Sequence, residues 1–242
     1  MNSSELKKNQ EALWTVIDQR FSEVVKKYGS IVYCKKEYLN KPVYDGCLDV
    51  EKYATAPIHV MWILKEHNDM PKTLDNGHFS AFVDCFSDPE GFKKNVSKYR
   101  SLRLIERASR RLLKQPEGDP TMAFKSVAIV NLGKCPGENT TSDSRLDDLV
   151  KWWGDILTKQ VSVYKPDMII VPGSHFPRIA KLLACDQTTG RSSRKGKAKA
   201  ELYTANGSLP IITIQHPSWY GCKEHDWMSA LSKAASKAGC RM

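Results

Sequence analysis

The sequence predicts an α/β fold, a three-layer α/β/α sandwich with a central, mainly parallel four-stranded sheet. Four short runs are apolar on both faces, as parallel strands are when helices cover them on each side. These runs are IHVMWIL (58–64), SVAIVNL (126–132), DMIIVPG (167–173) and PIITIQ (210–215). Segments with helical periodicity lie between the runs, and such alternation is typical of a parallel sheet.

The helices are predicted from apolar residues that recur every three or four positions. Residues 4–28 have this pattern and end at Gly29. We therefore expect an N-terminal amphipathic helix over residues 1–29, packed on a single domain formed by residues 30–242. Further helices are expected over residues 97–115, 144–164 and 176–184. In the first of these, four arginines are expected to point outward: Arg103, Arg107, Arg110 and Arg111.

Composition narrows the class of protein. The chain has 242 residues, of which 41% are apolar and 26% charged, as in ordinary globular proteins. Its longest apolar runs have about seven residues, whereas a membrane-spanning helix needs about twenty. The N-terminus has no apolar signal core. Seven cysteines without a C-x-x-C pair indicate reduced thiols. We expect a cytoplasmic protein, nuclear in a eukaryote, without a membrane partner.

The charge favours a polyanionic partner. Lys and Arg number 37 against 27 Asp and Glu, which gives a formal charge of +10. The stretch GRSSRKGKAKAE (190–201) concentrates this charge and is expected to form a flexible loop. It is either simply solvated or contacts backbone phosphates. The phosphate-contacting candidates are Arg191, Arg194, Lys195 and Lys197.

Polar residues follow each predicted strand, in the segments KEHND, GKCPGENTT, GSHF and HPSWYG. The carboxyl ends of parallel strands share one edge of a sheet, and ligands bind at that edge. Side chains far apart in the sequence are therefore expected to converge there. They are Glu66, His67, Asn131, Ser174, His175 and His216.

Several common motifs are absent from the sequence. No G-x-G-x-x-G follows a strand, and GRSSRKGKA has neither the spacing nor the Ser/Thr of a phosphate-binding loop. Ser174 has no G-x-S-x-G context. His216, Cys222 and His225 are too scattered to indicate a metal site. The sequence thus predicts no metal and no nucleotide cofactor.

Three blocks, in order, resemble the uracil-DNA glycosylase superfamily, and most closely its iron–sulfur branch. They are MWILKEHND, the segment AIVNLGKCPGENTT that continues through a helix to DMIIVPG, and ITIQHPSWYG. The resemblance spans roughly residues 58–222. It implies the α/β/α sandwich of that superfamily and DNA, single- or double-stranded, as the partner; no protein partner is predicted.

The resemblance also implies roles for individual residues. Glu66 corresponds to the acidic residue of the opening motif, Asn131 to the base-reading asparagine, and His216 to the histidine of the closing motif. Phe79 is the candidate for stacking on the base. A carboxylate could stabilise the cationic sugar and orient water, while an imidazole could donate to the departing base.

The residues after His216 suggest how DNA would be handled. Enzymes that act on a base extrude its nucleotide from the stack. Trp219 and Tyr220, which follow Pro217 and Ser218, are placed to fill the vacated space as apolar wedges. Ser218 is included among the expected DNA contacts. The same aromatic pair could instead bind a protein partner.

The chain also departs from the family pattern. KEHND lacks the Gly and Pro of the opening motif G-E-x-P-G. Cys135 corresponds to one cluster ligand, but the other cysteines are missing, so no iron–sulfur cluster is expected.

Three functions remain open. The first is a monofunctional glycosylase for uracil or a related deaminated base, with Lys65 and Lys134 keeping Schiff-base chemistry possible. The second is a weak or inactive member that binds nucleic acid or a modified base. The third is a nucleoside- or nucleotide-processing hydrolase.

Overall fold

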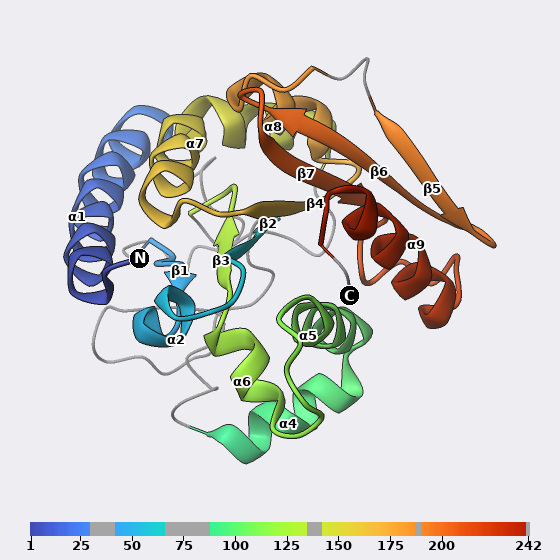
Figure 1. The fold of residues 1–242 in the computed structure, drawn as a ribbon. Coiled ribbons are helices and arrows are strands. Elements are labelled where there is room, and N and C mark those ends of the chain that lie inside the picture. The colour runs from blue at the N-terminus through green and yellow to red at the C-terminus, as the bar shows by residue number, and fades with distance from the viewer. Residues whose placement is uncertain (30–41, 66–87, 135–141, 187–189, 241–242) are drawn as a thin grey trace.

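The computed structural model describes residues 1–29, 42–65, 88–134, 142–186 and 190–240, which form a mixed α/β protein around one sheet (Figure 1). The described strands are β1 (Gly46–Cys47), β2 (Val60–Leu64), β3 (Ala128–Asn131), β4 (Met168–Pro172), β5 (Arg191–Lys195), β6 (Ala198–Ala205) and β7 (Leu209–Ile214). The described helices are α1 (Ser3–Tyr28), α2 (Val50–Ala54), α4 (Pro89–Lys98), α5 (Arg100–Leu112), α6 (Pro120–Lys125), α7 (Asp143–Tyr164), α8 (Phe176–Leu182) and α9 (Glu224–Lys237).

The sheet has seven strands in the order β1-β3-β2-β4-β7-β6-β5. Its middle four strands, β3-β2-β4-β7, are parallel and are the four runs predicted from their apolar character. The expected count of four was wrong, because β1 extends one side and the β6–β5 hairpin extends the other, all through antiparallel pairs.

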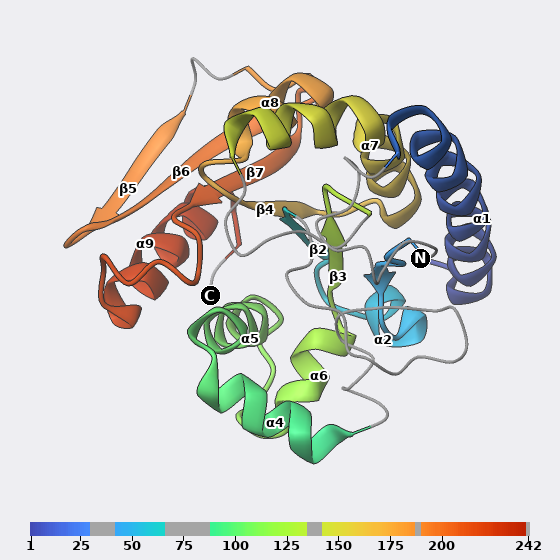
Figure 2. The same cartoon turned by 180° about the vertical axis from the view of Figure 1, so that it is seen from behind.

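Helices lie on both faces of the sheet (Figures 1 and 2). On β2, Met61 and Ile63 belong to the apolar cluster that includes α1, α7 and α8. Val60 and Trp62 belong to a second cluster that includes α4, α5, α6 and α9. The alternation follows from the strand repeat of two residues, and explains why β2 is apolar on both faces.

The composition of the basic stretch 190–201 suggested a flexible loop, and this prediction was wrong. It forms most of the β5–β6 hairpin, whose turn has Gly196 at φ 53°. A positive φ at the first central residue of a two-residue turn suits glycine and the twist of a hairpin. In β5 only Ser193 is buried, so the charged side chains occupy an exposed edge strand.

The helix expected over 97–115 corresponds mainly to α5 (Arg100–Leu112), and its first two residues belong to α4 (Pro89–Lys98), which was not predicted from the sequence. The chain is extended at Tyr99 (φ −94°, ψ 119°), where α4 ends and α5 begins. Arg110, expected to face outward, is instead buried. It pairs with Glu106 one turn earlier, and its guanidinium donates to carbonyl groups of the turn that leads to α6.

The N-terminal helix α1 packs against α7. Its buried stripe of Leu6, Leu13 and Ile17 joins the cluster with α7, and Arg20 pairs with Asp155 of α7 at 2.7 Å. Within the described part of the chain, no helix combines the length and apolar character needed to cross a membrane.

Candidate functional site

The carboxyl ends of the four parallel strands lie side by side, as the sequence predicted. Leu64 of β2 is in register with Asn131 of β3, and the pairing continues beyond the strands where Gly133 N–H donates to Lys65 O at 2.7 Å. On the other side, Gly173 N–H donates to Ile214 O at 2.8 Å, which joins the ends of β4 and β7. A continuous edge therefore runs from Asn131 to the residues after β7.

Between β2 and β4 the strand order changes direction: β2 is followed along the chain by β3 on one side, and β4 is followed by strands on the other side. The chain after β2 leads to α4, α5 and α6 on one face, whereas β4 leads to α8 on the other (Figure 1). In open α/β sheets a crevice forms at such a point, and ligands bind there. Lys65 follows β2 at this point, His175 follows β4, and His216 follows the neighbouring β7.

His216 is fixed in one orientation by Ser218. Its Nδ1 accepts a hydrogen bond from the Ser218 backbone N–H at 3.2 Å and lies 2.6 Å from Ser218 Oγ. Because Nδ1 is an acceptor, the neutral ring carries its proton on Nε2. Burial, assisted by the charge of Lys65, lowers the pKa of His216 to about 4. At neutral pH this ring is an uncharged donor.

His175 packs edge-on against His216, with the ring centroids 6.3 Å apart. Only 4% of its surface is exposed, and its Nδ1 has no hydrogen-bond partner among the described residues. Burial is the main reason that the pKa of His175 falls to about 3, followed by the charges of His216 and Lys65. Both imidazoles are therefore neutral, and the charge of Lys65 reaches both.

Asn131 ends β3 at this edge and is buried. Its backbone N–H donates to Asp45 Oδ2 at 2.5 Å. We find no hydrogen bond from its side-chain amide to another described residue. Strand alternation places the side chain on the same face as Ile129, toward the cluster of α5 and α9.

Lys134 stabilises the turn that follows Asn131. Its Nζ is fully buried and donates to Asp45 at 2.7 and 2.9 Å, to Gln160 Oε1 at 2.9 Å and to Asn131 O at 2.5 Å. Burial lowers the pKa of Lys134, and Asp45 opposes this effect. An amine that is buried and bound in this way is not placed to attack a substrate carbon, which argues against Schiff-base chemistry at Lys134. Asp45 was not foreseen, because no sequence pattern links residues 45 and 134.

The loop of residues 217–222 follows His216 and carries the predicted wedge residues. Tyr220 is 81% exposed and Trp219 43% exposed, and Ser218 is also at the surface. A methyl group at Gly221 would lie 1.9 Å from the Trp219 ring, so the indole folds back over this glycine. Tyr220 is therefore the more prominent of the two aromatics.

The hairpin brings positive charge to the same edge. Gln215, just before His216, accepts from Lys199 N–H at 2.9 Å through its side-chain oxygen and donates to Lys197 O at 3.4 Å. The turn of the hairpin thus lies beside the end of β7. Its four predicted phosphate contacts are all exposed: Arg191, Arg194, Lys195 and Lys197.

Two predicted site residues, Glu66 and Phe79, lie outside the described residues, as do His67 and Cys135. The acidic and stacking roles therefore stay predictions. In the ranges that the structure describes, no three His, Cys, Asp or Glu side chains gather as metal ligands would. A groove on the surface between α1 and α7 is lined by Leu13, Val16 and Val163, and none of the strand-end residues contribute to it.

No family model matches the sequence, and no curated protein matches it. One similar solved structure is a domain of unknown function, DUF1537, from Bordetella bronchiseptica, a domain-swapped dimer with bound citrate. The TM-score is 0.35 at 10% identity, over 79% of this chain and 44% of that one. This chain thus spans less than half of that protein's length, and a similarity at this level carries no argument about function.

Proposed function

We propose that the protein is a DNA glycosylase of the uracil-DNA glycosylase type, a three-layer α/β/α sandwich that hydrolyses the N-glycosidic bond of uracil or a related deaminated base. The observation that carries the proposal is His216. It is a neutral donor, oriented by Ser218, on the sheet edge that also holds Asn131.

The chemistry requires a donor at the departing base. As the glycosidic bond breaks, negative charge develops on a carbonyl oxygen of uracil. A fixed Nε2–H of His216 would stabilise that oxygen most strongly where water is excluded, and removal of such a donor typically costs about 10²–10³ in rate. The charge of Lys65, which reaches His216, would act in the same direction.

Asn131 supports discrimination between bases. Its amide could donate an N–H to O4 of uracil and accept from N3–H. Cytosine presents the opposite pattern, so both amide groups would lose their partners in a buried position. Glu66, if placed as the resemblance implies, would stabilise the cationic sugar and orient the attacking water.

Binding to DNA is supported by the surroundings of the site. The exposed Tyr220 would enter the stack when the nucleotide leaves it, at an unstacking cost of about a few kcal/mol. The basic side chains of the β5–β6 hairpin would contact phosphates next to the site. Salt should therefore weaken binding.

The test is cleavage of a uracil-containing oligonucleotide by alkali after incubation with the protein. We expect abasic sites with the wild type, a loss of about 10²-fold or more in His216→Ala, and a similar loss in Glu66→Ala. His225→Ala is the control, because His225 is exposed on α9, where it pairs with Asp226. Equal rates for the His216 and His225 variants would contradict the proposal.

The sequence KEHND favours a second candidate, a superfamily member that binds nucleic acid without cleaving it. Lys65 and Asn68 stand where the family has the Gly and Pro of its opening motif. Tight, salt-sensitive binding without abasic sites would support this candidate. Absence of both binding and cleavage would favour the nucleoside- or nucleotide-processing hydrolase.

A further inference from the structure

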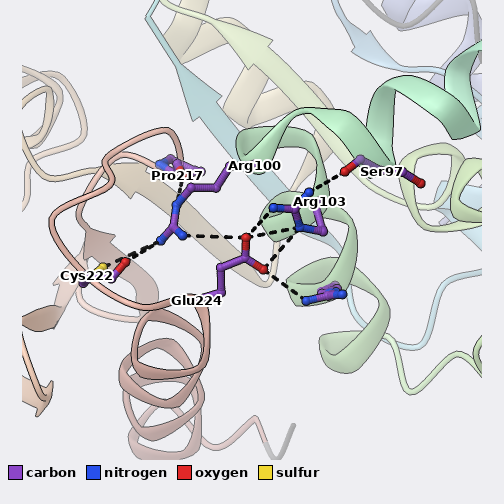
Figure 3. A network of polar contacts seen from close by, with 7 residues as sticks. Ser97, Arg100, Arg103, Pro217, Cys222 and Glu224 are labelled. Carbon is purple, nitrogen blue, oxygen red and sulfur yellow. Dashed lines mark hydrogen bonds and ion pairs between the residues drawn. The ribbon is translucent and has the colours of Figure 1, made fainter.

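Arg100 of α5 joins the two ends of the 217–222 loop (Figure 3). Its Nε donates to Pro217 O at 3.1 Å, and its Nη2 donates to Cys222 O at 3.0 Å. One planar guanidinium thus spans a loop whose ends are five residues apart in the sequence. A lysine has no such fork and could bond only one end well.

Arg100 is itself held in place by Glu224, the first residue of α9. Arg100 is only 7% exposed, and its Nη1 lies 3.6 Å from Glu224 Oε1. The same carboxylate binds Arg103 and Arg107 from the next turns of α5. These contacts compensate the buried charge of Arg100 and fix the plane of its guanidinium. Arg100 therefore acts as a clamp that holds both ends of the 217–222 loop.

The clamp also supports the exposed aromatic. The guanidinium of Arg100 lies over the ring of Tyr220, 5.6 Å from its centroid. This is within the range of a cation–π contact. The backbone of the loop is tied to the site as well, because Trp219 N–H donates to His216 O at 2.8 Å. Arg100, Tyr220 and His216 therefore form one connected unit.

We propose that Arg100 is a positioning residue that holds the 217–222 loop in the conformation needed to push a nucleotide out of a duplex. The proposal rests on the proposed function, and assigns to Arg100 the extrusion step and not the bond cleavage. An ordered loop presents Tyr220 without a further loss of conformational freedom on binding.

The clamp is tested first in the free protein, by amide hydrogen exchange of the segment 216–223. Arg100→Met should exchange this segment at least about tenfold faster than the wild type, and Arg100→Lys should lie between them. Arg110→Met is the matched control, since Arg110 is a buried arginine of the same helix that binds carbonyls of another turn and pairs with Glu106. Unchanged exchange in Arg100→Met, or an equal increase in Arg110→Met, would overturn the clamp.

The positioning role is tested by single-turnover excision of uracil from a duplex and from the same strand alone. Arg100→Met should reduce the duplex rate at least about tenfold more than the single-strand rate, because only the duplex requires extrusion. General loss of structure, as in Arg110→Met, should lower both rates by the same factor.

The outcomes separate the two proposals. Equal losses on both substrates in Arg100→Met would overturn the positioning role while the glycosylase function stands. If the wild type excises neither substrate, the glycosylase function fails and the positioning role fails with it. The exchange experiment then still decides whether Arg100 holds the loop.

Discussion

The two ends of the candidate site are held in different ways. The turn after Asn131 depends on Lys134, a cation of that same turn. Its carboxylate partner is Asp45, which directly precedes β1 and is also buried. The loop after His216 depends on Arg100 and Glu224, both from helices, and Glu224 is partly exposed. In both places a cation binds backbone carbonyl groups of the loop itself.

The difference concerns rigidity. A buried ion pair is costly to break and hardly responds to salt, so the end of the site at Asn131 is fixed by the core. In the Arg100 cluster the guanidinium of Arg100 is buried, but Glu224 and Arg103 are partly exposed and Arg107 is exposed, so solvent screens most of these charges. The loop after His216 is thus held in part by charges that salt can screen. Breaking each pair separately tests this contrast.

The largest effect is expected at the buried pair. Lys134→Met leaves the Asp45 carboxylate buried without its cation, which should lower the free energy of unfolding by about 3–5 kcal/mol. Urea denaturation measures this loss. The double variant Lys134→Met, Asp45→Asn should be more stable than Lys134→Met alone, because no charge is left unpaired. A double variant that loses the sum of the single losses would contradict the coupling.

An intermediate effect is expected from the histidines that lie between the two regions. In the folded protein the pKa of His175 is about 3 and that of His216 about 4, both below the ordinary 6.5. Below about pH 6.5 the unfolded chain binds protons that the folded protein does not, so stability falls as the pH falls toward these values.

His175→Gln should remove much of this loss, roughly a few kcal/mol between pH 7 and pH 4. Urea titrations at several pH values measure it, and His225→Gln serves as the exposed control. An unchanged pH dependence in His175→Gln would show that His175 is not buried in its neutral form. The pKa of Glu224 is lowered first by its hydrogen bonds with Arg103, so its contribution to stability is fully present above its ordinary value near 4.5 and is lost as the pH falls below that value.

The smallest effect is expected in the Arg100 cluster. Glu224→Gln should lower the free energy of unfolding by about 1 kcal/mol at low salt, because Glu224 is partly exposed and the glutamine amide still offers an oxygen to the arginines. Raising the salt to about 1 M should remove most of this difference. The loss in Lys134→Met should persist under the same conditions. If salt affects both variants equally, the contrast between a buried and a screened end is wrong.

Much of the fold followed from the sequence because its signals are local. The four parallel strands were found, since burial on both faces requires continuous apolar runs such as those of β2 and β4. The β5–β6 hairpin was missed because an edge strand needs only one buried side chain, here Ser193, so its composition resembles that of a loop. Helix α4 was missed because it buries only Phe92 and Val96, which is too few apolar residues to give a clear helical period.

The site was partly predictable for the same reason. His216, His175 and Asn131 were placed at one sheet edge by the rule that parallel strands share their carboxyl ends. Arg100 gave no signal, because its partners Pro217 and Cys222 are 117 and 122 residues away. Arg110 could have been suspected from Glu106 four residues earlier, a spacing that allows an ion pair on one helix.

The sequence by itself determined which segments are buried, since the hydrophobic effect depends on composition and on a repeat of two or 3.6 residues. It also determined which polar side chains end the strands. Only the tertiary structure decided which polar groups bind one another: Lys134 binds Asp45, Arg100 binds the 217–222 loop, and His216 binds Ser218 near the charge of Lys65. Hydrogen bonds and ion pairs act over a few ångströms, and such distances exist only after folding has brought distant residues together.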